Sequence, residues 1–194
     1  MKTRSLIAAA GLVLLLAGCT ATDPLAEQYQ NGSGQGYISG DGTLEVAPDQ
    51  RGEAIAFEGE SIDGDAITNE DFAGEVTVLN FWYANCPPCR IEAPYLAELS
   101  AEYDGVAFLG VNTSDEAAVA RLFEDENGIE YPSILDARTA SVQLAFAGAG
   151  AVAPNAVPTT LVLDREGRVA ARISGVIKDP SILASMLDTV LAEQ

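Results

Sequence analysis

Two cysteines separated by two residues, Cys86 and Cys89, have the clearest capacity for chemistry in this sequence. They follow an apolar run typical of a buried strand and precede a segment with helical periodicity. A cysteine at the N-terminus of a helix has its thiolate stabilised by the helix dipole. We therefore predict thiol–disulfide exchange, with Cys86 as the exposed nucleophile and Cys89, one helical turn later, as the shielded thiol that releases the partner.

Two other uses of a cysteine pair are known in proteins, a zinc site and a structural disulfide. A four-cysteine zinc site needs further ligands, but the only other cysteine is Cys19 and the sequence contains no histidine. A purely structural disulfide is the second alternative. A bridge that closes so short a loop removes little chain entropy and would stabilise the protein weakly. The sequence thus favours a redox pair, and we expect neither a metal nor an organic cofactor.

Four separated motifs carry a resemblance to a known family. They are Phe81-Trp82, Cys86-Pro87-Pro88-Cys89, Pro94, and Val157-Pro158-Thr159-Thr160. In this order they resemble the membrane-tethered TlpA/ResA group of thioredoxin-fold proteins, over about residues 48–194. The resemblance implies an α/β thioredoxin-like fold with a mixed central sheet flanked by helices and an N-terminal β-hairpin. It also implies a bacterial, extracytoplasmic disulfide reductase, commonly one that serves cytochrome c maturation.

The resemblance further assigns a substrate-binding surface around the cysteines. It implies that Pro158 follows a cis peptide bond and faces the cysteine pair, and that Val157 offers backbone groups to an extended substrate. Trp82, Pro87 and Pro88 complete this predicted surface. A lone X-Pro bond is cis only about 5% of the time, so the cis assignment depends on the resemblance alone.

Glu92 is the third predicted catalytic residue. It lies three positions after Cys89, on the same face of the expected helix, so its carboxylate can exchange a proton with that thiol or raise the pKa of the thiol. From spacing alone, a solvated helix residue is an equally good interpretation. The resemblance favours function, since ResA-like proteins have a glutamate at this position. Asn80, in the preceding apolar run, is interpreted as a hydrogen-bonded polar group of the core.

The N-terminus has the features of a lipoprotein leader. Lys2 and Arg4 precede an apolar stretch over 6–17, which is too short to span a bilayer but fits a signal peptide. The stretch ends in Leu16-Ala17-Gly18-Cys19, which resembles a bacterial lipobox and implies that Cys19 is lipidated. The alternative is an ordinary signal peptide in which Cys19 is incidental.

We accordingly predict three regions: a lipoprotein signal peptide over 1–18, a flexible tether over 19–52, and a thioredoxin-like domain over 53–194. Cleavage of the leader removes two of the ten basic residues and none of the 29 acidic ones, so the formal net charge goes from −19 to −21. Such an acidic chain is repelled by phosphate. Nucleic acid is therefore excluded as a partner, and membrane attachment would depend on the lipid anchor at the extracytoplasmic face of the cell membrane.

Periodicity places the expected elements along the domain. A helix continuing from Cys89 should bury Ile91, Leu96 and Leu99, and a helix beginning near 114–116 should bury Val119, Leu122 and Phe123. The Ala/Gly-rich loop 147–156 has no predicted role. The expected strands are 54–57 paired with 66–68 as the N-terminal hairpin, 76–81, 106–111, a short strand or loop over 131–136, and a hairpin of 161–164 and 168–173. Further helices are expected at 140–146 and from 180 onward.

The dipeptide between the cysteines bears on the direction of electron flow. Pro87 and Pro88 lack N–H groups and no histidine is present, so two means of stabilising the Cys86 thiolate are missing. We expect a reducing couple that acts on protein disulfides, such as those of apocytochrome c, and is itself reduced by a membrane thiol–disulfide electron donor. The alternatives are an oxidant or isomerase of the same fold, a copper-delivery protein and a thiol peroxidase.

Overall fold

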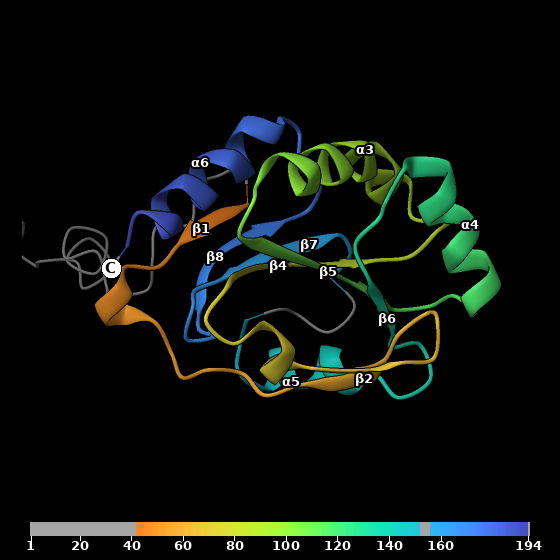
Figure 1. Cartoon of the computed structure of the whole chain (residues 1–194), viewed down its shortest axis with the longest axis horizontal. Helices are drawn as coiled ribbons and strands as arrows, with labels where there is room; N and C mark the ends of the chain where they lie inside the picture. The colour runs from red at the N-terminus through yellow and green to blue at the C-terminus, as the bar shows by residue number, and fades with distance from the viewer. Residues whose placement is uncertain (1–41, 152–155, 194) are drawn as a thin grey trace, which may run out of the picture. The chain divides into compact units, whose positions relative to one another are not determined.

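A mixed six-stranded sheet forms the centre of the protein in this computed structural model, which describes residues 42–151 and 156–193 (Figure 1). The strand order is β1-β8-β7-β4-β5-β6. The central strand β4 (Val76–Trp82) is buried along its whole length, as expected for a sheet covered on both faces. The predicted leader, Cys19 and most of the predicted tether lie outside the described residues.

Strands β5 (Val106–Asn112) and β6 (Ser133–Leu135) continue the sheet parallel to β4 on one side. On the other side, β7 (Thr159–Leu163), β8 (Val169–Ser174) and β1 (Thr43–Glu45) add antiparallel pairs. The predicted α/β fold with a mixed sheet is therefore confirmed.

Helices cover both faces of this sheet. Helix α3 (Pro87–Glu102) connects β4 to β5, and α4 (Ala117–Asn127) connects β5 to β6. Because crossovers between parallel strands are right-handed, both helices lie on the same face. The C-terminal helix α6 (Pro180–Leu191) packs beside α3, and α5 (Ser141–Gly148) covers the opposite face (Figure 1).

Alternation along β4 divides the core between the two faces. Leu79 and Phe81 pack on the α5 side, where Phe81 meets the ring of Phe146 edge to face. Val78 packs on the α3 and α6 side. Because successive side chains of a strand point to opposite faces, Asn80 is directed toward α3. The strand thus presents one buried amide to the helix that follows the cysteines.

The N-terminal hairpin is present, but its first strand was predicted in the wrong place. The hairpin pairs β2 (Glu58–Glu60) with β3 (Ala66–Thr68), whereas the sequence indicated a strand at 54–57. Residues 54–57 do not pair as a strand: Phe57 packs into the core against Phe146 and Ile55 is half-buried, whereas Ala54 and Ala56 are exposed. At Gly59 in β2, a Cβ atom would collide with Ile134, so the close approach requires glycine.

The predicted tether boundary at residue 52 is also wrong. Thr43–Glu45 form the edge strand β1, paired with β8, and a 3-10 helix η1 follows at Pro48–Gln50. The buried side chain of Arg51 forms ion pairs with Asp164 and Glu193. The folded part therefore includes at least residues 43–51. A second 3-10 helix, η2 (Asn69–Phe72), follows β3.

Three apolar helix residues that were predicted to be buried are exposed. Ile91 on α3 is 58% exposed, and Val119 and Leu122 on α4 are 44% and 58% exposed. Small residues, among them Ala93 and Ala120, occupy the buried positions of these helices together with the predicted Leu96, Leu99 and Phe123. The apolar pattern alone predicted the wrong buried positions on α3 and α4, because the small side chains of Ala93 and Ala120 are buried in place of the larger Ile91, Val119 and Leu122.

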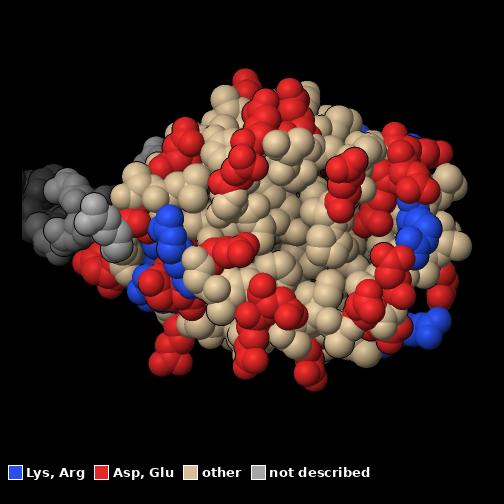
Figure 2. Space-filling view, viewed as in Figure 1, with Lys and Arg blue, Asp and Glu red and all other residues tan. Residues whose placement is uncertain are grey.

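The surface carries the negative charge that the composition implies. Acidic side chains are spread over the face shown in Figure 2, and basic side chains gather at two of its margins. Within the described ranges, no helix combines the length and the apolar composition needed to cross a membrane.

Candidate active site at the start of helix α3

Cys86 and Cys89 form a disulfide, with 5.3 Å between their Cα atoms. Cys86 is the N-cap of α3, and its Sγ accepts a hydrogen bond from the backbone N–H of Cys89 at 3.2 Å. Pro87 and Pro88 have no N–H, so the amide of Cys89 is the first donor that the helix offers. It is directed at the sulfur on which a thiolate would form.

Both sulfurs are shielded in this disulfide form. Cys86 and Cys89 are each 2% exposed and pack in a cluster with Trp82, Ala93 and Phe123. The prediction that Cys86 is exposed is therefore wrong for the oxidised protein. Both cysteines pack within this cluster, while Pro87 between them remains exposed.

The predicted substrate surface is only partly accessible. Trp82 is buried and stacks on Phe123, with 4.5 Å between the ring centroids. It packs in the same cluster as the two cysteines and offers little accessible surface to a substrate. Pro87 is exposed and Pro88 is half-buried. The N-terminal turn of α3 thus provides the apolar surface beside the cysteines.

The Val157–Pro158 peptide bond is cis, as predicted. Val157 is half-buried and packs against the cluster that contains both cysteines. Pro158 is buried, and its carbonyl accepts a hydrogen bond from Gly175 N–H at 2.9 Å. A segment 70 residues beyond the cysteines in the sequence is therefore fixed beside them.

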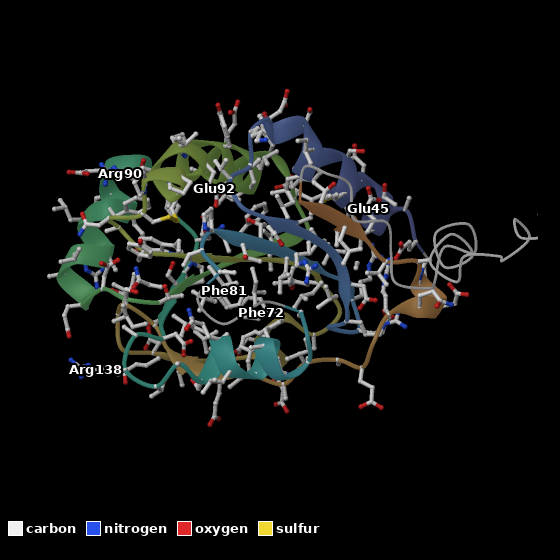
Figure 3. All side chains as sticks on the ribbon, turned by 180° about the vertical axis from the view of Figure 1, so that it is seen from behind. Glu45, Phe72, Phe81, Arg90, Glu92 and Arg138 are labelled. Atoms are coloured by element: carbon white, nitrogen blue, oxygen red, sulfur yellow. A yellow bond between two sulfur atoms is a disulfide. The ribbon has the colours of Figure 1, made fainter. Side chains whose placement is uncertain are left out.

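Glu92 is fully buried, so the interpretation as a solvated helix residue is wrong. Its Oε1 accepts a hydrogen bond from Asn80 Nδ2 at 2.8 Å, and its Oε2 accepts one from the backbone N–H of Ile177 at 2.8 Å. Asn80 also donates to Thr160 Oγ1 at 3.0 Å, which confirms that it is a hydrogen-bonded core group. Figure 3 shows Glu92 in the interior, whereas Arg90 lies at the outer surface beside α4.

Burial controls the electrostatics of Glu92. Loss of hydration raises its pKa to about 7, although the hydrogen bonds from Ile177 and Asn80 favour the carboxylate and lower it. A carboxyl with this pKa exchanges protons readily near neutral pH. Helical spacing places it one turn from Cys89, so the geometry provides a thiol pair and a titratable group on one helix.

Two residues that were not predicted from the sequence hold the loop before Cys86. Asp115 Oδ2 accepts a hydrogen bond from Ala84 N–H at 2.6 Å, and Arg90 Nη1 donates to the Ala84 carbonyl at 3.2 Å. The available signal was an Asn-x-x-Asp spacing, Asn112 to Asp115, at the end of a buried strand. In the part of the chain that the structure describes, no three metal-ligating side chains gather into a group.

Comparisons with known proteins agree with this geometry. The Redoxin family matches residues 47–191. The thiol-disulfide oxidoreductase ResA of Halalkalibacterium halodurans is 29% identical over 119 residues, which are 60% of this chain and 64% of ResA. The thiol:disulfide interchange protein HelX of Rhodobacter capsulatus is 33% identical over 119 residues, 61% of this chain and 62% of HelX. The chain thus spans less than two thirds of the length of these relatives.

Solved structures extend the similarity to almost whole proteins. A DsbF homologue from Corynebacterium diphtheriae superposes with a TM-score of 0.69 at 30% identity, covering 79% of this chain and 98% of that protein. A secreted thiol-disulfide isomerase from Corynebacterium glutamicum gives a TM-score of 0.67 at 30% identity, with 80% and 96% covered.

Proposed function

This chain belongs to the Redoxin family, and from the cysteine pair at the start of α3 we propose that it is a thiol–disulfide oxidoreductase that reduces protein disulfides. One observation carries the proposal. The Cys86–Cys89 disulfide lies at a helix N-terminus, where an amide is directed at Cys86 Sγ, and a buried carboxyl follows one turn later. ResA and HelX, each similar to about 60% of this chain, are named for thiol–disulfide chemistry.

The proposed cycle begins with the reduced pair. The Cys86 thiolate attacks one sulfur of a substrate disulfide, a new S–S bond forms, and the other substrate sulfur leaves as a thiolate that takes up a proton. Cys89, after losing its proton, then attacks Cys86 Sγ. This step forms the Cys86–Cys89 disulfide and releases the second substrate thiol. Two electrons have moved from the pair to the substrate.

Glu92 is proposed to handle the proton of Cys89 during the second step. A thiol must be deprotonated to attack, and its ordinary pKa of about 8.5 leaves little thiolate at pH 7. A carboxylate with a pKa of about 7 is a matched base for that proton, because its affinity for the proton is neither negligible nor too high to release it.

We propose net reduction in the cell, with apocytochrome c as the substrate class. Haem attachment requires free thiols in a compartment that favours disulfides, so a dedicated reductant answers a chemical need there. The absence of N–H groups at Pro87 and Pro88 and of any histidine supports a weakly stabilised thiolate, hence a reducing couple. A dithiol donor in the membrane would return two electrons to the pair.

The proposed location is the extracytoplasmic face of the membrane, with attachment through acylated Cys19. The C. glutamicum relative is described as secreted, which fits an extracytoplasmic site. Replacing Cys19 with Ala should release the protein from the membrane fraction or leave the leader uncleaved. Recovery of the wild-type protein without acylation, in the soluble fraction, would overturn this part of the proposal.

The decisive measurement is the midpoint potential of the Cys86–Cys89 pair in a dithiol buffer. A reductant should lie near thioredoxin, at about −270 mV, whereas a strong oxidant lies near about −120 mV. Deletion should lower covalent c-type cytochrome, and an added small thiol should restore it. A strongly oxidising potential, with the pair oxidised in cells, would support the rival oxidant or isomerase function instead.

Trapping tests the order of the two cysteines. Cys89→Ser should accumulate mixed disulfides through Cys86, because the resolving thiol is absent. Cys86→Ser should accumulate none. The reverse pattern, seen on non-reducing gels, would exchange the two roles.

A further inference from the structure

In the backbone segment that leads into Cys86, Ala84 is held by side chains on both its N–H and its carbonyl. Its N–H donates to Asp115 Oδ2 at 2.6 Å, and its carbonyl accepts from Arg90 Nη1 at 3.2 Å. Two residues later, Cys86 N–H donates to the carbonyl of Tyr83 at 3.1 Å. The position of Cys86 therefore depends on where Ala84 is held.

Asp115 is itself held rigidly. Asn112, fully buried at the end of β5, donates from Nδ2 to Asp115 Oδ2 at 2.8 Å. The Oδ1 atom of Asn112 accepts the backbone N–H groups of Ser114 and Asp115 at 3.2 Å and 2.8 Å. This closed turn fixes the carboxylate against β5, which pairs with β4 along its whole length. A chain of contacts thus runs from the sheet through Asn112 and Asp115 to the loop before the cysteine.

The opposite side of the loop is less constrained. Arg90 is exposed, its Nη2 lies 3.7 Å from Glu126 Oε2, and its guanidinium lies 5.6 Å from the centre of the Phe123 ring. A solvated pair of this kind fixes geometry weakly. Asp115, with two short hydrogen bonds to a buried partner and to the loop, is the stronger restraint.

We propose that Asp115 is a positioning residue for the nucleophile: by holding Ala84 it keeps Cys86 Sγ opposite the N–H of Cys89. This inference rests on the proposed function, because it concerns the reactivity of the reduced pair. Among residues 42–151 and 156–193, only the amide of Cys89 is directed at the sulfur, since Pro87 and Pro88 have no N–H. A small movement of Cys86 would therefore remove much of the local stabilisation of its thiolate.

The charge and the position of Asp115 act in opposite directions. A carboxylate near Cys86 disfavours a second negative charge, so removing only the charge should increase the thiolate fraction. Removing the hydrogen bond should reduce that fraction, because the sulfur loses its alignment with the Cys89 amide. Two substitutions separate these effects: Asp115→Asn keeps an acceptor and removes the charge, and Asp115→Ala removes both.

The experiment measures the alkylation rate of Cys86 by iodoacetamide at pH 7, in the reduced full-length protein with Cys89→Ser. Asp115→Ala should slow alkylation by about ten-fold or more, the scale set by the loss of one hydrogen bond to a charged group. Asp115→Asn should leave the rate unchanged or raise it. Glu116→Ala is the matched control, since it removes the neighbouring charge, which pairs at the surface with Arg138.

Equal rates for Asp115→Ala and wild type, or equal shifts for the Ala and Asn variants, would overturn the proposal. Hydrogen exchange gives a test that does not depend on the variants folding. The Ala84 amide of the reduced wild-type protein should exchange far more slowly than the amide of exposed Asn85, and equally fast exchange would also overturn it. Neither result depends on the midpoint potential or on cytochrome c, so the proposed function can fail separately.

Discussion

Two carboxylates are buried near opposite ends of the central strand β4, and they differ in how their charge is balanced. Asp164 follows β7 at the end where Leu163 pairs with Thr77, at the start of β4. Its Oδ2 lies 3.0 Å from Arg51 and 2.8 Å from Arg168. Glu92, near the other end, accepts hydrogen bonds only from the neutral groups of Asn80 and Ile177 among the described residues.

The difference shows how the same fold uses a buried acid in two ways. At the Asp164 end, the cations compensate the charge, and Arg51 also joins the segment before β2 to Glu193, which follows helix α6. At the Glu92 end, burial raises the pKa of the carboxyl to about 7, although its neutral hydrogen-bond donors lower it. A compensated carboxylate fastens structure, whereas an uncompensated one can gain and lose a proton beside the cysteines.

The largest expected effect comes from breaking the compensated cluster, which consists of Arg51, Asp164, Arg168 and Glu193. Arg51→Met should lower the free energy of unfolding by about 3–5 kcal/mol, because it leaves Asp164 and Glu193 without their shared cation. Denaturant unfolding checks this, and the midpoint potential should not change. Arg138→Met, at an exposed ion pair, is the control and should cost no more than about 0.5 kcal/mol. Equal losses in both variants would show that the cluster contributes no special stability.

The next effect is a dependence of stability on pH that Glu92 creates. Its pKa is raised in the folded state, so its contribution is fully present below its ordinary pKa of 4.5 and is lost as pH rises through about 7. Relative to Glu92→Gln, the wild type should therefore lose up to about 3 kcal/mol between pH 4.5 and pH 8. Paired unfolding curves at several pH values measure this difference.

A second acid makes a control necessary for that experiment. Burial also raises the pKa of Glu124 to about 7, although Ser133 and Arg121 lower it. Glu124→Gln should remove its own part of the pH dependence and leave the Glu92 part intact. A Glu92→Gln protein with the same pH dependence as the wild type would mean that Glu92 does not titrate in this range.

A smaller effect is expected on the rate of exchange. Glu92→Gln should slow release of the mixed disulfide by about ten-fold at pH 7, because Cys89 loses its base. In this variant, the rate of release should vary with pH without the inflection near pH 7 that titration of Glu92 produces in the wild type. Glu98→Gln, on the exposed side of the same helix, is the matched control and should leave the profile unchanged. An inflection that persists in Glu92→Gln would assign the base to another group.

The smallest effect is expected at Glu193, where the compensated cluster reaches solvent. Its side chain is 26% exposed, so Glu193→Gln should cost about 1 kcal/mol or less. Asp164 keeps both of its cations in that variant. A loss as large as that of Arg51→Met would place the main contribution in the bidentate Arg51–Glu193 contact.

Local sequence determined the chemistry and the order of elements. Three local features indicate the active site: the Cys86–Cys89 spacing, the prolines that open α3 and the apolar strand before them. Each lies within about ten residues of the others, so these features could be interpreted without knowledge of the fold. The β4 strand and most helices and strands were predicted for the same reason. The cis bond before Pro158 was reached only through the family resemblance, since its local base rate is low.

Tertiary structure alone decided which residues are buried and what they contact. Glu92 receives its hydrogen bonds from partners 12 and 85 residues away, and Arg51 meets Glu193 across 142 residues. The exposure of Ile91 and Leu122 and the shielding of both sulfurs likewise depend on how helices pack. The sequence shows which ionisable groups are present. Their pKa values and ion pairs depend on distances between groups, and only the folded sheet and its helices establish those distances.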